Sequence, residues 1–456
     1  MADESYSYDV NWEILEGLVR FGSRLETVPT LAEGWVNPDE LTYLFRLRPG
    51  LRFSDGQPLS ASDVAASIRG AMERRWVNRD YLQAIETVRV VNPTTVEIRT
   101  RYPYPILLSK LPWGMVLPAA ALDQDPVPVV GSGPYRLESW RPGEEFVLSK
   151  NRYFRGPGPY FERVRFLVVS DASARASGLL QGRYDIADAL PPPQAAGLRG
   201  QDALRVFAGP GLRVLFLGLR VDRQPFSDAR VREAVDLALD RGELIERAYD
   251  GRTEAAAQLV PPAVVGFHPG IGVTKPDPVR ARALLAAAGH AKGLELRLDG
   301  PTNRYVNDGR ILHEVARQLA LVGIRATVNG LDKKEWFPLV LSGRSQIHLL
   351  GWQCQSAEAG QALDSIVHSR TQGLLGSANS TGVADGELDR LIEVAHRSGN
   401  AEQRALALQA AMARVAQLRP VLPLLVQAEG IAVSRRVEWT PPAHYALRVS
   451  EMRPAP

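Results

Sequence analysis

The amino-acid sequence predicts an α/β fold whose stability comes from buried apolar surface alone. Apolar segments follow one another as strand, helix and strand at residues 163–187 and again at residues 294–352. The single cysteine, Cys354, excludes an intramolecular disulfide framework and every metal site built from several cysteines. A chain of 456 residues, 45% of them apolar, can bury a sizeable core. At roughly 100–200 residues per domain, it should form two to four domains.

The first 130 residues predict two helices and two hairpins. Apolar residues recur every three or four positions in the helices, whereas apolar and polar residues alternate in the strands. Turns such as Arg48-Pro49-Gly50 separate the strands of each hairpin. The expected elements are a helix near residues 10–19 that stops before Gly22, a hairpin of 41–47 with 51–53, a helix through 64–72 capped by residues 60–63, and a hairpin of 88–91 with 95–99.

Glycine and proline are dense at residues 126–145, which indicates a boundary, and alternating strands and helices follow it. Residues 258–262 mark a second change of composition. The expected elements are strands at 163–169, 184–187, 212–221, 294–298, 322–328, 347–352 and 421–426, and helices through 179–180 and at 229–239, 278–288, 311–321, 386–397 and 401–418.

Charge balance and motif content exclude several classes of function. With 54 Lys and Arg against 51 Asp and Glu, the net charge of +3 gives no surface for a polyanion, and we expect no nucleic acid partner. The weakly polar residues 106–122 contain Lys110 and prolines, and they fall short of the ~20 apolar residues that a membrane-spanning helix needs. The first six residues have neither the basic nor the apolar region of a secretory signal.

Catalysis finds little support in the sequence. The seven histidines form no HExxH or HxxxH pair, no GxSxG motif occurs, and residues 131–134 lack the Gly-Lys of a phosphate loop. We therefore expect no catalytic residue, no metal site and no cofactor. Asp364 and His368, four residues apart, are typical of a surface ion pair, and a glycosidase pair among scattered carboxylates stays open.

Five segments then occur in the order that is typical of one known family. Together they resemble the extracytoplasmic solute-binding proteins of ABC importers for dipeptides, oligopeptides and nickel, and the resemblance runs from about residue 10 to residue 430. The segments are LEGLVRF at 15–21, LRPGLRFSDG at 47–56, GSGPYRL at 131–137, FSDARVREA at 226–234, and Gly351-Trp352.

The resemblance implies a two-lobed fold like that of periplasmic binding proteins, with an extra small domain in the first lobe and a hinge that the chain crosses twice. Such lobes close over a ligand, and the ligand shifts the equilibrium by its preference for the closed form. Crossings are expected near 258–262 and 425–427. The implied division is 1–40, 131–257 and 427–456 for the first lobe, 41–130 for the extra domain, and 258–426 for the second lobe.

The function implied by the resemblance is binding of a small polar solute, a peptide or a peptide-like molecule, and its delivery to the permease subunits of an ABC transporter. The protein would be a monomer without a reaction of its own, in the periplasm or otherwise outside the cytoplasm, and associated with the membrane through the transporter. Two other functions stay open. The protein could be a sensor that presents its closed form to a receptor, or a hydrolase that acts between the lobes.

The sequence departs from the family in two places. A signal peptide, a first strand and a short loop normally precede the helix that begins here near Tyr8. We expect a start assigned downstream or a truncated chain, rather than a cytoplasmic variant. In many peptide-binding members an aspartate stands three residues after the tryptophan, whereas Gln355 stands there in this chain. Either Glu358 supplies the carboxylate, or the ligand lacks a free ammonium group.

The remaining candidate ligand contacts lie in loops and at strand ends, and each has a structural alternative. Trp352 would form an apolar wall for the ligand or belong to the core, and Trp113 would cover the ligand from the first lobe or simply pack. The backbone at Ser132 and Gly133 would donate N–H groups or serve chain geometry. Arg304 and Tyr305 follow a strand end, where open α/β sheets bind ligands and where an arginine can bind a carboxylate or phosphate. Glu358 would bind the ligand or be solvated, and Cys354 is expected to be a small buried residue.

Overall fold

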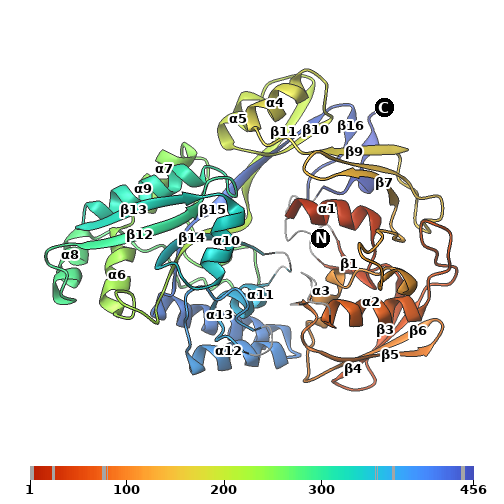
Figure 1. Ribbon diagram of the computed structural model, residues 1–456, viewed down its shortest axis with the longest axis horizontal. Helices are drawn as coiled ribbons and strands as arrows, with labels where there is room; N and C mark the ends of the chain where they lie inside the picture. The colour runs from red at the N-terminus through yellow and green to blue at the C-terminus, as the bar shows by residue number, and fades with distance from the viewer. Residues whose placement is uncertain are drawn as a thin grey trace.

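Two lobes joined by two long strands make up the protein in this computed structural model (Figure 1). The structure describes residues 5–22, 26–73, 79, 81–354, 356, 358–371, 375–442 and 447–456. The joining strands are β11 (Leu204–Leu219) and β15 (Val421–Ser434), which pair antiparallel with each other. Helices in both lobes, the mixed six-stranded sheet and the antiparallel sheets of the first lobe confirm the predicted α/β class and the two-lobed architecture.

The second lobe is built around a six-stranded sheet in the order β10-β15-β11-β14-β12-β13. Strand β12 (Leu294–Pro301) pairs in parallel with β13 (Ile324–Leu331) and with β14 (Ile347–Gln353), while β14 pairs antiparallel with β11. The helices of this lobe are α6 (Ala229–Ala238), α7 (Arg241–Tyr249), α8 (Pro278–Ala287), α9 (Asp308–Ala320), α10 (Lys333–Leu341), α11 (Gly360–Ala362), which continues as a π-helical turn at Leu363–Val367, α12 (Gly386–Arg397) and α13 (Ala401–Leu418).

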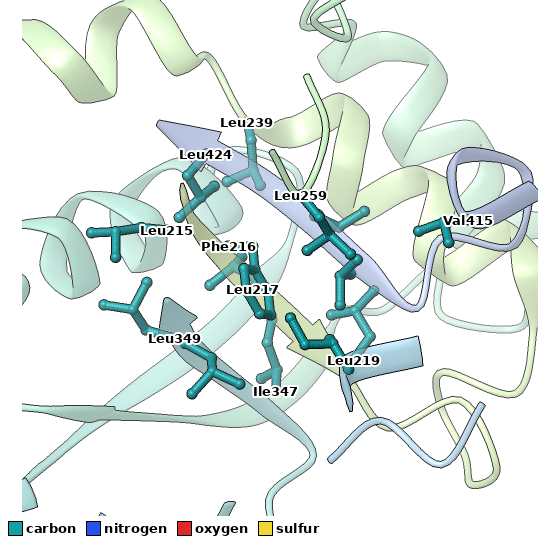
Figure 2. Packing of buried hydrophobic residues seen from close by; sticks show 14 of the residues in the cluster. Leu215, Phe216, Leu217, Leu219, Leu239, Leu259, Ile347, Leu349, Val415 and Leu424 are labelled. Atoms are coloured by element: carbon teal, nitrogen blue, oxygen red, sulfur yellow. The ribbon is translucent and has the colours of Figure 1, made fainter. Parts of the chain in front are cut away.

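A single apolar core holds the second lobe together (Figure 2). Phe216 and Leu217 of β11 are fully buried, as is Leu349 of β14. Val415 of α13 belongs to the same core. Burying one such side chain stabilises the fold by about 1.5–3 kcal/mol. The core explains why the strand segments read as continuous apolar runs in the sequence.

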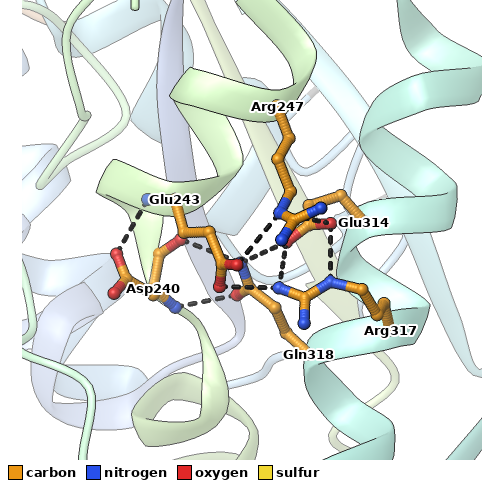
Figure 3. A network of polar contacts seen from close by, with 6 residues as sticks. All are labelled: Asp240, Glu243, Arg247, Glu314, Arg317 and Gln318. Carbon is orange, nitrogen blue, oxygen red and sulfur yellow. Dashed lines mark hydrogen bonds and ion pairs between the residues drawn. The ribbon is translucent and has the colours of Figure 1, made fainter.

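A polar network ties α7 to α9 at the surface of this core (Figure 3). Gln318 accepts the Asp240 N–H at 2.8 Å and donates to Glu314 at 2.8 Å. Arg317 donates to Glu314 at 2.6 Å and lies 2.6 Å from Glu243. Burial opposes the ionised form of Glu314, but the hydrogen bonds from Arg317 and Gln318 hold its pKa below the usual value. The network therefore fixes the packing of two helices that flank the sheet.

An extra small domain occupies the part of the first lobe farthest from the joining strands. Its antiparallel sheet has the order β3-β4-β6-β5, and α2 (Ala61–Glu73) packs against it. Ser60 donates to Asp63 through both its N–H and its hydroxyl, which is the expected cap of α2. The strands are β3 (Ala32–Val36), β4 (Thr42–Leu47), β5 (Ile85–Asn92) and β6 (Thr95–Thr100), followed by α3 (Leu107–Lys110).

The predicted hairpin of 41–47 with 51–53 is wrong. Strand β4 pairs with β3 on one side and with β6 on the other, so no edge is left for residues 51–53. That segment makes one bridge, Arg52 to Pro58, while Leu51 and Phe53 are buried in the domain core. The domain core also begins earlier than the expected residue 41, because Leu18 and Val19 belong to it.

The rest of the first lobe surrounds helix α1 (Ser5–Ile14). The predicted strand, helix and strand at 163–187 do not form one unit, because β9 belongs to a three-stranded sheet and β10 to the six-stranded one. The elements are β1 (Val19–Phe21) paired with β2 (Thr27–Pro29), the sheet of β7 (Tyr135–Arg141), β8 (Glu145–Lys150) and β9 (Arg163–Leu167), then α4 (Ala172–Leu180), β10 (Ile186–Leu190) and α5 (Pro192–Gly197), and finally β16 (Val437–Glu438) paired with β17 (Arg453–Pro454).

The first passage between the lobes lies inside β11 rather than at residues 258–262. Pairing of β11 with β15 is interrupted between Pro210 and Val214, and the first lobe lies on one side of this point and the second lobe on the other. Leu259 and Val260 are buried in the second-lobe core, as are Val231 and Leu244. Residues 213–257, expected in the first lobe, therefore pack in the second, because β11 carries the chain across without leaving the sheet.

In the described part of the chain, no helix is both long and apolar enough to cross a membrane.

Candidate functional site

The two lobes meet in this structure at a contact far from the joining strands. The Tyr104 ring of the first lobe lies edge-on to His396 of α12, with centroids 5.8 Å apart. The Arg397 guanidinium lies 5.9 Å from the Tyr102 ring. The lobes are therefore joined by β11 and β15, and they touch again through α12 and the segment that follows β6.

The loop after β12 brings Arg304 and Tyr305 to the end of the second-lobe sheet. Tyr305 is buried, accepts the Gly351 N–H at 2.9 Å and packs edge-on to Trp336. The Arg304 guanidinium lies 5.4 Å from the Tyr305 ring. Asp308 accepts the backbone N–H groups of both residues and so fixes the loop. Sequence reasoning had placed these two side chains at a strand end, and the structure does the same.

A second guanidinium, which sequence reasoning missed, lies near Tyr305. Arg213 of β11 is buried, and its charge lies 5.8 Å from the Tyr305 ring. Its Nη2 donates to Gln353 Oε1 at 2.5 Å. Burial raises the Tyr305 pKa, whereas Arg304 and Arg213 act in the opposite direction. A charged residue in the otherwise apolar run 212–219 was the sequence signal that would have found it.

Glu358 is buried and carries an ion pair. The Arg404 Nε of α13 lies 3.2 Å from Glu358 Oε2, and the two side chains are 20% and 8% exposed. Oε1 has no hydrogen-bond partner within the described residues. Burial raises the pKa of Tyr104 in the first lobe, and Asp364 and Glu358 of the second lobe act in the same direction. Gln355, the other residue of this predicted pair, lies outside the described residues.

Trp352 lies one residue before the end of β14, opposite Val214 of β11. Its ring is half-buried against the second-lobe core. The indole Nε1 is buried and has no acceptor in the part of the chain that the structure describes. Because neighbouring strand residues point to opposite faces, Trp352 lies on the face opposite to Arg213 and Gln353. The indole ring therefore packs against the core, while its N–H group makes no hydrogen bond to a described residue.

Comparisons with known proteins agree with this arrangement. Residues 26–373 match the family described as bacterial extracellular solute-binding proteins, family 5. The chain belongs to this family. Family 5 proteins are extracytoplasmic, bind small ligands and work with the permeases of ABC transporters, as the sequence resemblance implied, and they are binding proteins rather than enzymes.

Among the relatives, the glutathione-binding protein GsiB of Escherichia coli O1:K1 / APEC is 27% identical over 442 residues, which cover 93% of this chain and 86% of that protein. Two solved structures share the fold. PBP AgaA from A. tumefaciens R10, in complex with agropinic acid, has a TM-score of 0.89 at 23% identity and covers 99% of this chain and 94% of its own. DppA from Helicobacter pylori, in complex with the peptide STSA, has a TM-score of 0.88 at 20% identity, with 97% and 93% covered.

In this family 5 protein, Trp113 is fully buried in an aromatic cluster of the first lobe. It stacks on Tyr81 at 4.4 Å between centroids and packs against Trp12 and Phe21 at 5.2 and 6.3 Å. No exposed face of the ring is left for a ligand in this structure, so the packing alternative describes Trp113 better than the covering role. The cluster attaches α1 to the small domain.

The Gly131-Ser132-Gly133 segment packs against the end of α1. A Cβ at position 131 would lie 2.0 Å from the Ile14 carbonyl oxygen, and one at position 133 would lie 2.7 Å from the Glu13 carbonyl oxygen. The Gly133 N–H donates to Ile14 at 2.9 Å, and Ser132 is buried. The two glycines therefore let the backbone of this segment pack closely against the backbone at the end of α1. The Gly133 N–H already donates to the Ile14 carbonyl.

The expected surface ion pair of Asp364 and His368 is wrong, because both residues are buried and each has another partner. His396 lies 2.5 Å from Asp364 Oδ1, while His368 lies 3.5 Å from Asp389. The π-helical turn at 363–367 shifts the register, so four residues do not place Asp364 and His368 on one face. Cys354 is buried as predicted. No described group of three His, Cys, Asp or Glu side chains could hold a metal ion.

Proposed function

We propose that this protein binds a small polar solute of the peptide or peptide-like class between its two lobes and delivers it to the permease of an ABC importer outside the cytoplasm. We further propose that the ligand carries a carboxylate but no free ammonium group. The observation that carries this second statement is the ion pair of Glu358 with Arg404.

The electrostatics at Glu358 disfavour an ammonium group. Because Arg404 already compensates the carboxylate, a ligand ammonium would meet a neutral pair and a nearby positive charge. A neutral N–H group, such as that of an acylated amine, needs no counter-charge and fits the unpartnered Oε1. This favours the alternative in which the ligand lacks a free ammonium group.

The opposite end of the ligand is assigned to the arginines at Tyr305. Two guanidinium groups within 6 Å of one ring place positive charge at the end of the sheet, and the planar guanidinium suits a carboxylate. The relatives support the carboxylate and the peptide-like class but not the absence of an ammonium group, since GsiB is named for glutathione and the two structural neighbours hold a peptide and agropinic acid.

Calorimetric titration with four forms of trialanine tests this proposal. The forms are the free peptide, the N-acetyl peptide, the C-terminal amide and the doubly blocked peptide, with glutathione as a fifth compound. We expect the N-acetyl acid to bind at least as tightly as the free peptide, and amidation to weaken binding at least tenfold. Arg304→Gln and Arg213→Gln should remove that tenfold preference, whereas Arg325→Gln, at a side chain that is 81% exposed, should leave it unchanged.

Each result bears on one part of the proposal. Tighter binding of the free peptide than of the acetylated one contradicts the absence of an ammonium group. Equal binding of acid and amide contradicts the carboxylate site. Failure of all five compounds to bind, while a metal chelate or a sugar binds, contradicts the peptide-like class.

A further inference from the structure

The contact between the lobes at Tyr104 and His396 is built from side chains that are buried on both sides. Tyr104 and His396 are each 2% exposed, and Asp364, which lies 2.5 Å from His396, is 5% exposed. Water is thus excluded from the Asp364–His396 pair, which lies where the two lobes meet. The stability of such a pair depends on both side chains staying in place, because a buried charge left without its partner is strongly destabilising.

The first-lobe half of the contact is held rigidly. Tyr102 and Tyr104 alternate with Pro103 and Pro105, and proline restricts both its own backbone and that of the residue before it. The Tyr43 hydroxyl of β4 donates to the Tyr104 carbonyl oxygen at 2.9 Å. The two tyrosine rings meet edge-on, with centroids 5.7 Å apart at 88°. The rings are therefore presented to the second lobe in a fixed arrangement.

The second-lobe half comes from the end of α12 and from the π-helical turn. Arg397 lies over Tyr102, and the same guanidinium lies 3.3 Å from Glu393 one turn earlier. Burial raises the pKa of Tyr102 to about 12, and Asp364 and Glu393 act in the same direction while Arg397 opposes them. Several of the groups that act on these tyrosines belong to the other lobe, so separation of the lobes would remove those interactions, while Tyr104 would keep its packing in the small-domain core.

We infer that Tyr102 and Tyr104, together with Asp364, His396 and Arg397, form an interlobe latch that stabilises the closed arrangement of the lobes before any ligand is bound. Helix α12, which carries the second-lobe half of the latch, lies away from the place where β11 and β15 pass between the lobes (Figure 1), so the contact opposes an opening motion about those strands. Its strength sets the ratio of closed to open molecules, and through that ratio the apparent affinity for every ligand.

The test measures the distance between the lobes in the unliganded protein, so it does not depend on the ligand proposed above. Spin labels at Val36→Cys in β3 and Leu406→Cys in α13 report the separation, because both positions are exposed and the native Cys354 is buried. We expect Tyr104→Ala to lower the ratio of closed to open molecules by roughly tenfold, and Arg397→Ala by roughly threefold. Tyr104→Phe, which keeps the ring, and Arg390→Ala, at an exposed arginine of the same helix, should leave the ratio within twofold of the parent.

Two outcomes decide the inference. Loss of the closed population in both Tyr104→Ala and Arg397→Ala, with the controls unchanged, supports the latch. Arg397 lies at the end of its helix with a largely exposed side chain, so its variant keeps the test valid even if Tyr104→Ala does not fold. Unchanged distance distributions in Arg397→Ala, or equal losses in Arg397→Ala and Arg390→Ala, overturn it. With a ligand in hand, the apparent Kd should rise by the factor by which the unliganded closed fraction falls.

Discussion

If Glu358 faces the ligand as proposed, Arg404→Gln should shift the preference of this protein from an acylated amine toward a free ammonium group. In the parent, Arg404 Nε lies 3.2 Å from Glu358 Oε2, and both side chains are largely buried. At an effective dielectric constant of about 20, the Coulomb attraction at that distance is about 5 kcal/mol. Desolvation of the two groups offsets much of it, but removing one partner from such a pair costs about 3–5 kcal/mol.

The variant leaves the Glu358 carboxylate buried and uncompensated, and a ligand ammonium would then supply the missing charge. An ammonium about 4 Å away would gain about 4 kcal/mol at the same dielectric constant, before the cost of its own dehydration. We expect a net gain of roughly 1.4–2.8 kcal/mol, which is a ten- to hundredfold change in the ratio of Kd values for acetylated and free trialanine.

Titration calorimetry of the parent and of Arg404→Gln with both peptides measures that ratio. Glu358→Gln combined with Arg404→Gln is the matched control, because it removes the charge and should abolish the new preference. An unchanged ratio in Arg404→Gln, in a variant that still binds one of the peptides, would refute the assignment of Glu358 to the ligand. Arg414→Gln, which breaks the ion pair with Asp385 at the other end of α13, should not alter the ratio.

Three further predictions concern stability. Gly131→Ala should lower the free energy of unfolding in urea by about 3 kcal/mol, because the added Cβ would meet the Ile14 carbonyl at 2.0 Å. Gly34→Ala, with no atom within 4 Å of the new Cβ, is its control, and equal losses would contradict the packing role. Burial raises the pKa of Glu16 to about 7, so its contribution to stability is full below about pH 4.5 and is lost as the pH rises through 7. Between pH 5 and pH 8, the free energy of unfolding of Glu16→Gln should rise by about 2 kcal/mol relative to that of the parent. Parallel curves of unfolding free energy against pH for the two proteins would disprove this. Leu217→Ala, at a fully buried position of β11, should cost about 2–5 kcal/mol, whereas Leu406→Ala, at 58% exposure, should cost less than about 0.5 kcal/mol, as read from urea midpoints.

Helices with strong caps and clear periodicity could be predicted to the residue. Helix α12 begins after Asp385, whose carboxylate accepts the Leu388 N–H, and both ends agree with the predicted 386–397. Asn400 caps α13 in the same way, and its predicted bounds of 401–418 are also confirmed. These signals are local, since a cap and an apolar stripe lie within a few turns of one helix.

Partners that are distant in the chain could not be predicted. Strand β4 pairs with β3, which directly precedes it, and with β6, which follows only after α2 and β5, and no turn motif shows that β6 rather than residues 51–53 takes the second edge. The passage between the lobes in β11 lies between Pro210 and Val214, and the sequence Gly209-Pro210-Gly211 beside it reads as an ordinary turn. Only its pairing with β15, more than 200 residues later, shows that the strand continues.

The candidate site shows the same limit in chemical terms. Sequence reasoning identified Glu358 as a carboxylate near a strand end, and that position is correct, but its electrostatic effect depends on Arg404, a residue of another helix. Arg304 was identified as one arginine in a loop, but it acts together with Arg213, which lies near the same Tyr305 ring and belongs to strand β11, 91 residues earlier in the chain. A charge in a cleft acts with its neighbours and not alone, because neighbouring charges and burial together set whether the ionised form is favoured. The recognition chemistry of a solute-binding protein therefore follows from pairs such as Arg404 with Glu358, and the same carboxylate would select an amine in one pairing and an amide in the other.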